Sequence, residues 1–258
     1  MHLTAAQSVI WLIGFILESL LCVVAVRRKL FRDFPIFTAY VFVVPARAVL
    51  MFGLYRIAGY NSFTAFYSYW FTQVVELCLR VASIGELAWV VSRPYPGFRL
   101  VLKWVLPGVA MALLLRAGLM AAPRAMFLPG FVLILERELE LAAALVLCVL
   151  LVLSRRYDVE VQARVRYLAA GLLFYSLFQV ANNAISQARF NSTLRVWAVL
   201  RSASFCVSAL IWLIGLWKTE PVPPRRTLPE DVERQREAMT EGAKAMDKIM
   251  ERLRRFRR

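Results

Sequence analysis

Histidine and aspartate are scarce in this chain, and their positions exclude several kinds of active site. The only histidine is His2, and no aspartate lies inside a long apolar segment; the four are Asp33, Asp158, Asp231 and Asp247. A histidine base, a histidine-ligated metal, a Ser-His or Cys-His nucleophile and an aspartyl dyad are therefore excluded within those segments. The sequence predicts no catalytic residue, no metal site and no cofactor.

Paired cysteines are also lacking. The four cysteines, Cys22, Cys78, Cys148 and Cys206, fall in four different apolar segments, and none forms a CxxC motif. This spacing indicates neither a disulfide framework nor a zinc site, so we expect small apolar packing residues. Lysine is absent from 194–217, which excludes a retinal Schiff base there.

Long apolar runs dominate what is present. Of 258 residues, 60% are hydrophobic, and the mean hydropathy is +0.59. Runs of about 20 apolar residues separated by short basic loops are typical of polytopic α-helical membrane proteins. The sequence predicts an all-α fold, with a seven-helix transmembrane domain over 1–217 and a basic tail over 218–258. The predicted spans are roughly 5–26, 34–57, 66–91, 100–117, 128–153, 166–188 and 194–217.

The net charge of +15 is distributed unevenly along the chain. The first, third and fifth connections carry 4, 3 and 4 basic residues and the tail 12, whereas the even-numbered connections carry 5 in all. By the positive-inside rule, the N-terminus is outside and the C-terminus cytoplasmic. The 27 arginines against 5 lysines suggest a bacterial source, hence a bacterial inner membrane. Nothing resembles a nucleic-acid readout module.

Charged residues interrupt the predicted spans, most densely at Glu136-Arg137-Glu138-Leu139-Glu140. Ionisable groups at that depth are costly unless they pair or line a wet cavity. The number of residues between each polar group and the predicted outer end of its span gives its depth in the membrane. On this basis we predict a polar zone in the outer half of the bundle that contains Arg47, Glu76, Arg80, Glu136, Arg137, Glu140, Asn182, Asn183 and Arg201. Glu76 and Arg80 can pair at i, i+4, and an arginine from another helix, Arg47 or Arg201, would bridge Glu136 and Glu140. Glu138 would face the opposite side.

Two interpretations of this zone remain open. It is either an ion-pair network that fixes helix packing, or an outward-opening pocket in which arginines hold an anionic group and carboxylates an amine or a proton. The second predicts a ligand-sensing or ligand-binding membrane protein rather than an enzyme, with a small polar or anionic ligand. The alternatives are a small transporter or proton/ion-coupled carrier using the same residues and, third, a lipid-acting enzyme.

The tail has its own pattern, a proline-rich linker over 219–229 followed by a predicted amphipathic helix over 230–258. The helix ends in a basic cluster: Lys244, Lys248, Arg252, Arg254, Arg255, Arg257 and Arg258. This composition predicts binding to anionic lipid headgroups of the bilayer. A short coiled coil, which would join protomers or dock a cytoplasmic signalling partner, is the alternative, and a disordered basic tail is the third.

Overall fold

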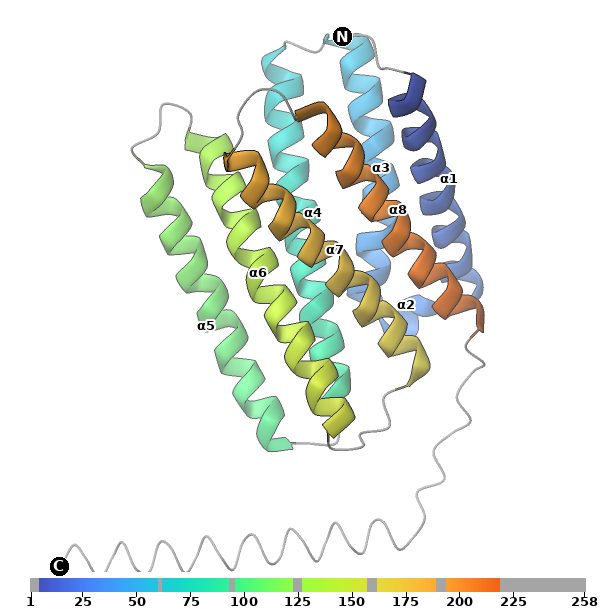
Figure 1. Cartoon of the computed structure of the whole chain (residues 1–258), viewed down its shortest axis with the longest axis vertical. Helices are drawn as coiled ribbons and strands as arrows, with labels where there is room; N and C mark the ends of the chain where they lie inside the picture. Colours follow the sequence, from blue (N-terminus) through green and yellow to red (C-terminus); the bar gives the residue numbers. More distant parts are fainter. Residues whose placement is uncertain are drawn as a thin grey trace, which may run out of the picture. The chain divides into compact units, whose positions relative to one another are not determined.

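The computed structural model describes the backbone of residues 5–59, 62–92, 96–122, 127–156, 162–188 and 194–218. Over these ranges the chain is all-helical, as predicted, and contains no strand (Figure 1). The helices are α1 (Ala5–Arg27), α2 (Leu30–Asp33), α3 (Pro35–Ile57), α4 (Phe63–Val91), α5 (Pro96–Ala121), α6 (Phe127–Arg156), α7 (Ala163–Ala188) and α8 (Leu194–Lys218).

The chain divides into two compact units, Met1–Thr219 and Glu220–Arg258. The described helices all belong to the first unit. The predicted tail helix and its basic cluster lie outside the described residues, so the lipid-binding and coiled-coil hypotheses remain predictions.

The seven predicted segments are all helical, and one short helix was missed. Lys29 adopts a left-handed conformation (φ 51°) that separates α1 from α2, a helix of only 4 residues. A helix that short leaves no periodic pattern in the sequence. Pro35 begins α3, where its fixed φ and missing N–H are tolerated. Ser62 caps α4, because its hydroxyl accepts a hydrogen bond from the Ala65 N–H at 3.1 Å.

Among the described helices, two are long and apolar enough to cross a membrane: α3, over Pro35–Ile57, and α5, over Leu102–Ala121. Length and composition therefore account for two of the seven predicted spans. Helices α4 and α6 are longer, but they carry the buried charged residues described below, which lower their hydropathy.

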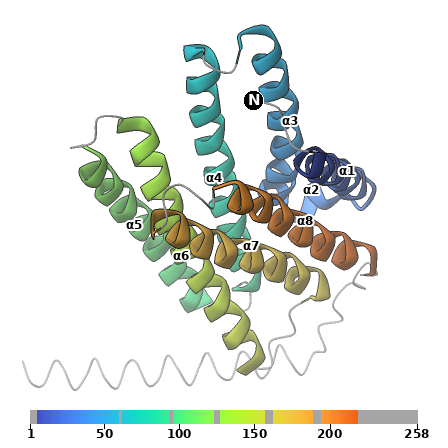
Figure 2. The ribbon, with the colours of Figure 1, turned by 45° about the horizontal axis from the view of Figure 1, so that its top comes forward.

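Six of the long helices form a closed ring. Each of α1, α3, α4, α6, α7 and α8 contacts the next, and α8 returns to α1. Helix α7 also contacts α4 across the ring, whereas α5 packs outside it, against α6 and α4 (Figures 1 and 2). We call the end of the bundle where α1 ends and α3 begins the basic end, and the other the opposite end. Because α4, α6 and α7 meet in the middle, their facing side chains share one interior.

Helices α7 and α8 are held close together by two glycines. A Cβ added to Gly171 would lie 2.3 Å from Nε1 of Trp212, and one added to Gly215 would lie 2.2 Å from Cβ of Tyr167. Small residues allow helix backbones to approach in this way. Trp212 is fully buried, and its indole N–H donates to the carbonyl of Leu168 at 3.1 Å.

The basic end is tied together by polar contacts between helices. The Glu86 carboxylate on α4 accepts hydrogen bonds from the N–H groups of Ile36 and Phe37 at 3.1 and 2.9 Å, and so caps α3. Asp33 pairs with Arg164 of α7 at 3.0 Å. Most of the buried apolar side chains lie in this half of the ring, which makes it the more densely packed half.

Candidate functional site

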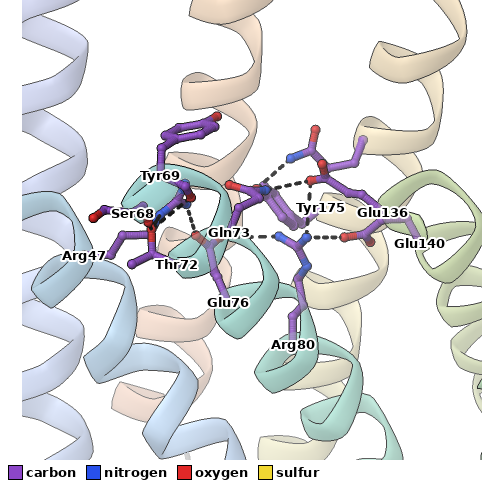
Figure 3. Close-up of polar contacts among 11 residues, drawn as sticks. Arg47, Ser68, Tyr69, Thr72, Gln73, Glu76, Arg80, Glu136, Glu140 and Tyr175 are labelled. Atoms are coloured by element: carbon purple, nitrogen blue, oxygen red, sulfur yellow. Dashed lines mark hydrogen bonds and ion pairs between the residues drawn. The ribbon is translucent and has the colours of Figure 1, made fainter. Parts of the chain in front are cut away.

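The centre of the ring contains a buried guanidinium surrounded by carboxylates. Nη2 of Arg80 lies 2.6 Å from Oε1 of Glu140 and 3.6 Å from Oε1 of Glu136, and Nη1 lies 3.6 Å from Oε1 of Glu76 (Figure 3). The Arg80 side chain is fully buried, with an exposed fraction of 0%. One arginine therefore joins three carboxylates from two helices.

Helical spacing explains why these groups meet. Gln73, Glu76 and Arg80 follow one another at three and four residues on α4, so they share a face. Glu136 and Glu140 do the same on α6. The two faces meet where α4 contacts α6, and the Gln73 amide N–H donates to Oε1 of Glu136 at 3.2 Å.

A second arginine extends the network to α3. Nη1 of Arg47 pairs with Oε2 of Glu76, and its Nε donates to Oγ1 of Thr72 at 3.1 Å. The guanidinium also lies over the ring of Tyr69, 5.1 Å from the ring centroid. Arg47 thus connects the centre of the ring to the opposite-end half of α3 and α4 (Figure 3).

Helix α7 also contributes side chains to the surroundings of Arg80. The ring of Tyr175 lies 4.9 Å from Cζ of Arg80, and its hydroxyl accepts a hydrogen bond from Nε2 of Gln179 at 2.7 Å. Ser176, Gln179 and Asn182 lie further along α7 and are all at least nine-tenths buried. Within the described part of the chain, Oγ of Ser176, Oε1 of Gln179 and Oδ1 of Asn182 have no hydrogen-bond partner.

We call the set Arg47, Glu76, Arg80, Glu136, Glu140, Gln73 and Tyr175 the Arg80 network. Its described ion pairs join two arginines and three glutamates. Charges buried in this way are costly unless they are paired.

Exposure falls along the network from α3 towards its centre. The side chain of Arg47 is 16% exposed and that of Glu76 8%, whereas Glu136 and Glu140 are at 2% and 1%. The least shielded part is therefore Arg47, between the opposite-end halves of α3 and α4. In those halves few side chains are fully buried.

The predicted i, i+4 pair of Glu76 and Arg80 is present in the structure. We expected Arg47 or Arg201 to bridge Glu136 and Glu140. In the structure Arg80 contacts both carboxylates, because α4 lies next to α6 in the ring, and the side chain of Arg201 lies outside the described residues.

Arg137, a predicted member of the polar zone, forms an ion pair with the neighbouring Glu138. Its Nη2 pairs with Oε1 of Glu138 at 2.8 Å, and Arg116 of α5 pairs with the other oxygen at 2.7 Å. Adjacent helical residues point about 100° apart, so Arg137 and Glu136 lie on different faces. Glu138 faces away from Glu136, as predicted. Asn182 is buried on α7, whereas the side chains of Asn183 and Arg201 lie outside the described residues.

Sequence reasoning missed the uncharged members of the site. Gln73, Tyr175 and Gln179 were not singled out, although each lies one helical turn from a residue that was considered or from another member. A search for polar residues at i, i+3 and i+4 within each span would have found them.

The Arg80 network offers carboxylates, guanidinium groups, an amide and a tyrosine ring (Figure 3). The described residues contain no group of three or more His, Cys, Asp or Glu side chains placed to hold a metal ion. Comparison of the chain with protein-family models, with curated proteins and with solved structures found no match.

Proposed function

We propose that this protein is a multi-pass membrane protein that binds or senses a small polar ligand at the Arg80 network. In this proposal α1 and α3–α8 are the seven spans, the N-terminus is outside, and the opposite end of the bundle faces outward from a bacterial inner membrane. The observation that carries the proposal is a network of four buried charged side chains from α4 and α6, joined by the partly exposed Arg47 of α3.

The exposed surface supports a location in lipid. Each of the seven long helices exposes large apolar side chains. On α1 they follow helical spacing with exposed fractions between 45% and 55%: Val9, Leu12, Ile13, Ile16, Leu20, Val23 and Val26. A soluble monomer rarely exposes apolar patches of more than a few hundred Å², whereas a bundle in a bilayer contacts lipid over its whole girth.

The burial of the network supports a binding role. Removing several charges from water costs several kcal/mol for each ion, and intramembrane ionisable residues typically mark ligand, proton or ion pathways. Arg80, Glu136 and Glu140 are almost fully buried, so a ligand would enter past Arg47 and exchange partners with these ion pairs. The network gives both a positive group for an anion and a carboxylate for a cation.

A proton- or ion-coupled carrier is the second candidate, and the three buried carboxylates of the network favour it. A buried carboxylate inside a bundle is a site that a proton can occupy and leave. The full-length protein in vesicles with an internal pH-sensitive dye should then pass protons down an imposed gradient, and Glu136→Gln should abolish the flux. A sensor shows no flux in either form.

The orientation can be tested by cysteine labelling in intact cells. In a cysteine-free background, single cysteines at positions 61 and 122 should react with a membrane-impermeant maleimide added outside, whereas one at 158 should react only after permeabilisation. Outside labelling of position 158 would overturn the proposed topology.

Ligand binding can be tested by thermal unfolding of the full-length protein in detergent against a panel of small amines, carboxylates and amino acids. At least one compound should raise the unfolding temperature, because a ligand that binds only the folded state stabilises it. Glu140→Gln should remove that response. Glu138→Gln, which changes a buried glutamate of the same helix outside the network, should keep it. Loss of the response in both variants would contradict the assignment of the site.

A further inference from the structure

Helix α5 lies in a long stretch of the chain that is basic and has no acidic residue. Between Glu86 and Glu136 there are five basic residues and no Asp or Glu. Arg116, in the opposite-end half of α5, pairs with Glu138 of α6 at 2.7 Å. Arg99 and Lys103, near the start of α5 at the basic end, form no ion pair with a carboxylate in the described part of the chain.

The guanidinium of Arg99 is held against α4 by an aromatic ring. Its Cζ lies 4.0 Å from the centroid of the Trp89 ring, a distance at which a cation is attracted to the face of an indole. Nε of Arg99 is buried and has no hydrogen-bond partner among the described residues, although the residue as a whole is partly exposed. The ring therefore positions the guanidinium but does not accept hydrogen bonds in its plane.

The acidic residue of α4 that is closest in sequence to Trp89 is engaged elsewhere. Glu86 lies three residues before Trp89, and its two oxygens accept hydrogen bonds from the N–H groups of Ile36 and Phe37 of α3. The described helices thus provide no carboxylate for Arg99.

Lys103 adds a second cation one helical turn further along α5. Residues four apart on a helix have their Cβ atoms about 5–6 Å apart on the same side. The side chain of Lys103 is exposed, and its Nζ lies 6.0 Å from the centroid of the Trp104 ring. A phosphate group has several acceptor oxygens, so it can accept hydrogen bonds from the guanidinium and the ammonium at once.

The surroundings of the two cations favour a lipid phosphate over a free one. Leu100 and Trp104 are 61% and 71% exposed, and Trp89 is 40% exposed. Amphipathic rings such as these favour the headgroup level of a bilayer. A free phosphate would leave the apolar side chains uncovered, whereas a phospholipid would cover them with its acyl chains.

We propose that Arg99 and Lys103, with the rings of Trp89 and Trp104 beside them, bind the phosphate of an anionic phospholipid at the basic end of α4 and α5. This inference rests on the membrane location in the proposed function, but not on the ligand of the Arg80 network. Basic groups between transmembrane helices on the cytoplasmic side hold anionic headgroups by the same combination of charge and hydrogen bonding.

Phosphatidylglycerol in neutral detergent micelles is the probe, and phosphatidylcholine with the same acyl chains is the matched lipid without net charge. Unfolding temperatures of the full-length protein are measured with each lipid, and with inorganic phosphate against sodium chloride at the same ionic strength. Phosphatidylglycerol should raise the unfolding temperature saturably and with the higher apparent affinity, because a ligand that binds the folded state stabilises it. Inorganic phosphate should have no effect. Equal affinities for the two lipids overturn the anionic headgroup, and an equal effect of inorganic phosphate overturns the lipid.

Single substitutions on α5 then locate the site. Arg99→Gln should weaken the apparent affinity for phosphatidylglycerol by about tenfold, the loss of one hydrogen bond between charged groups. Lys103→Gln should weaken it by about fivefold, the loss of one cation near an anionic lipid. The matched control is Arg116→Gln, the same change on the same helix at an arginine that pairs with Glu138, and it should leave the affinity unchanged.

The three side chains are at least partly exposed, so these variants should fold. Any lipid bound by the basic tail is common to the parent protein and to every variant, so the comparison removes it. Unchanged affinity in both Arg99→Gln and Lys103→Gln, or an equal loss in Arg116→Gln, overturns the site.

The two proposals fail in different ways. If alkaline carbonate releases the protein from membranes, the membrane location falls and the lipid site falls with it. If the protein stays in the membrane and a compound binds at the Arg80 network, but Arg99→Gln and Lys103→Gln keep their affinity for phosphatidylglycerol, only the lipid site is wrong.

Discussion

Replacing Arg80 by methionine should destabilise this protein more than any exposed arginine does. Methionine keeps the length and most of the volume of the side chain but removes the charge. Glu76, Glu136 and Glu140 then remain buried near one another without the guanidinium that joins them. Removing one partner of a buried ion pair costs about 3–5 kcal/mol, since the other charge is left uncompensated.

The matched control is Arg116→Met. Arg116 pairs with Glu138 at 2.7 Å, but its side chain is 53% exposed, and exposed ion pairs contribute about 0–1 kcal/mol. The two variants remove the same chemical group from helices of the same bundle. Arg80→Met should lose about 2–5 kcal/mol more unfolding free energy than Arg116→Met. This difference measures the effect of burying the ion pairs of Arg80.

A double-mutant cycle isolates the closest contact. Glu140→Leu alone removes one of the three carboxylates held by Arg80, and the double variant Arg80→Met/Glu140→Leu removes both partners. The two changes should be non-additive by about 1–3 kcal/mol, because the residues are in direct contact at 2.6 Å. The double variant should be less destabilised than the sum of the single ones.

Reversible unfolding in mixed micelles, followed by far-ultraviolet circular dichroism as the fraction of denaturing detergent rises, supplies the free energies. If Arg80→Met and Arg116→Met lose equal stability, or if the cycle is additive, the carboxylates are solvated separately and the reasoning about a shared network is refuted.

Three further predictions follow from packing, charge and the tail. Gly215→Ala should lower the free energy of unfolding by about 1–3 kcal/mol through overpacking, since the added Cβ would clash with Tyr167. Its control is Gly108→Ala, where an added Cβ has nothing within 4 Å; in thermal unfolding that variant should be neutral or slightly stabilised. Glu136→Ala should lower the unfolding temperature more than Glu138→Ala, whose arginine partners are partly exposed; equal effects would contradict the network. The peptide 226–258 should become helical on anionic vesicles and lose binding as salt rises, each basic residue adding about 1 kcal/mol; self-association without lipid would favour the coiled coil instead.

The sequence alone determined that the described part of the chain is helical and where the long helices lie. Long apolar runs separated by short basic loops are typical of helical bundles, and the predicted segments correspond to α1 and α3–α8. It also determined that Glu76 pairs with Arg80 and that Glu138 faces away from Glu136, because both relations depend only on the period of one helix.

Only the tertiary structure decided which helices face one another. The bridge between Glu136 and Glu140 comes from Arg80 because α4 contacts α6, and no local pattern specifies which helices of a ring are neighbours. For the same reason the sequence did not point to Tyr175 and Gln179, whose positions beside Arg80 depend on the packing of α7 against α4. The periodicity of a helix fixes the direction of each side chain about the helix axis. Which residue it meets is set by packing between helices, as in the contact of Gly171 on α7 with Trp212 on α8.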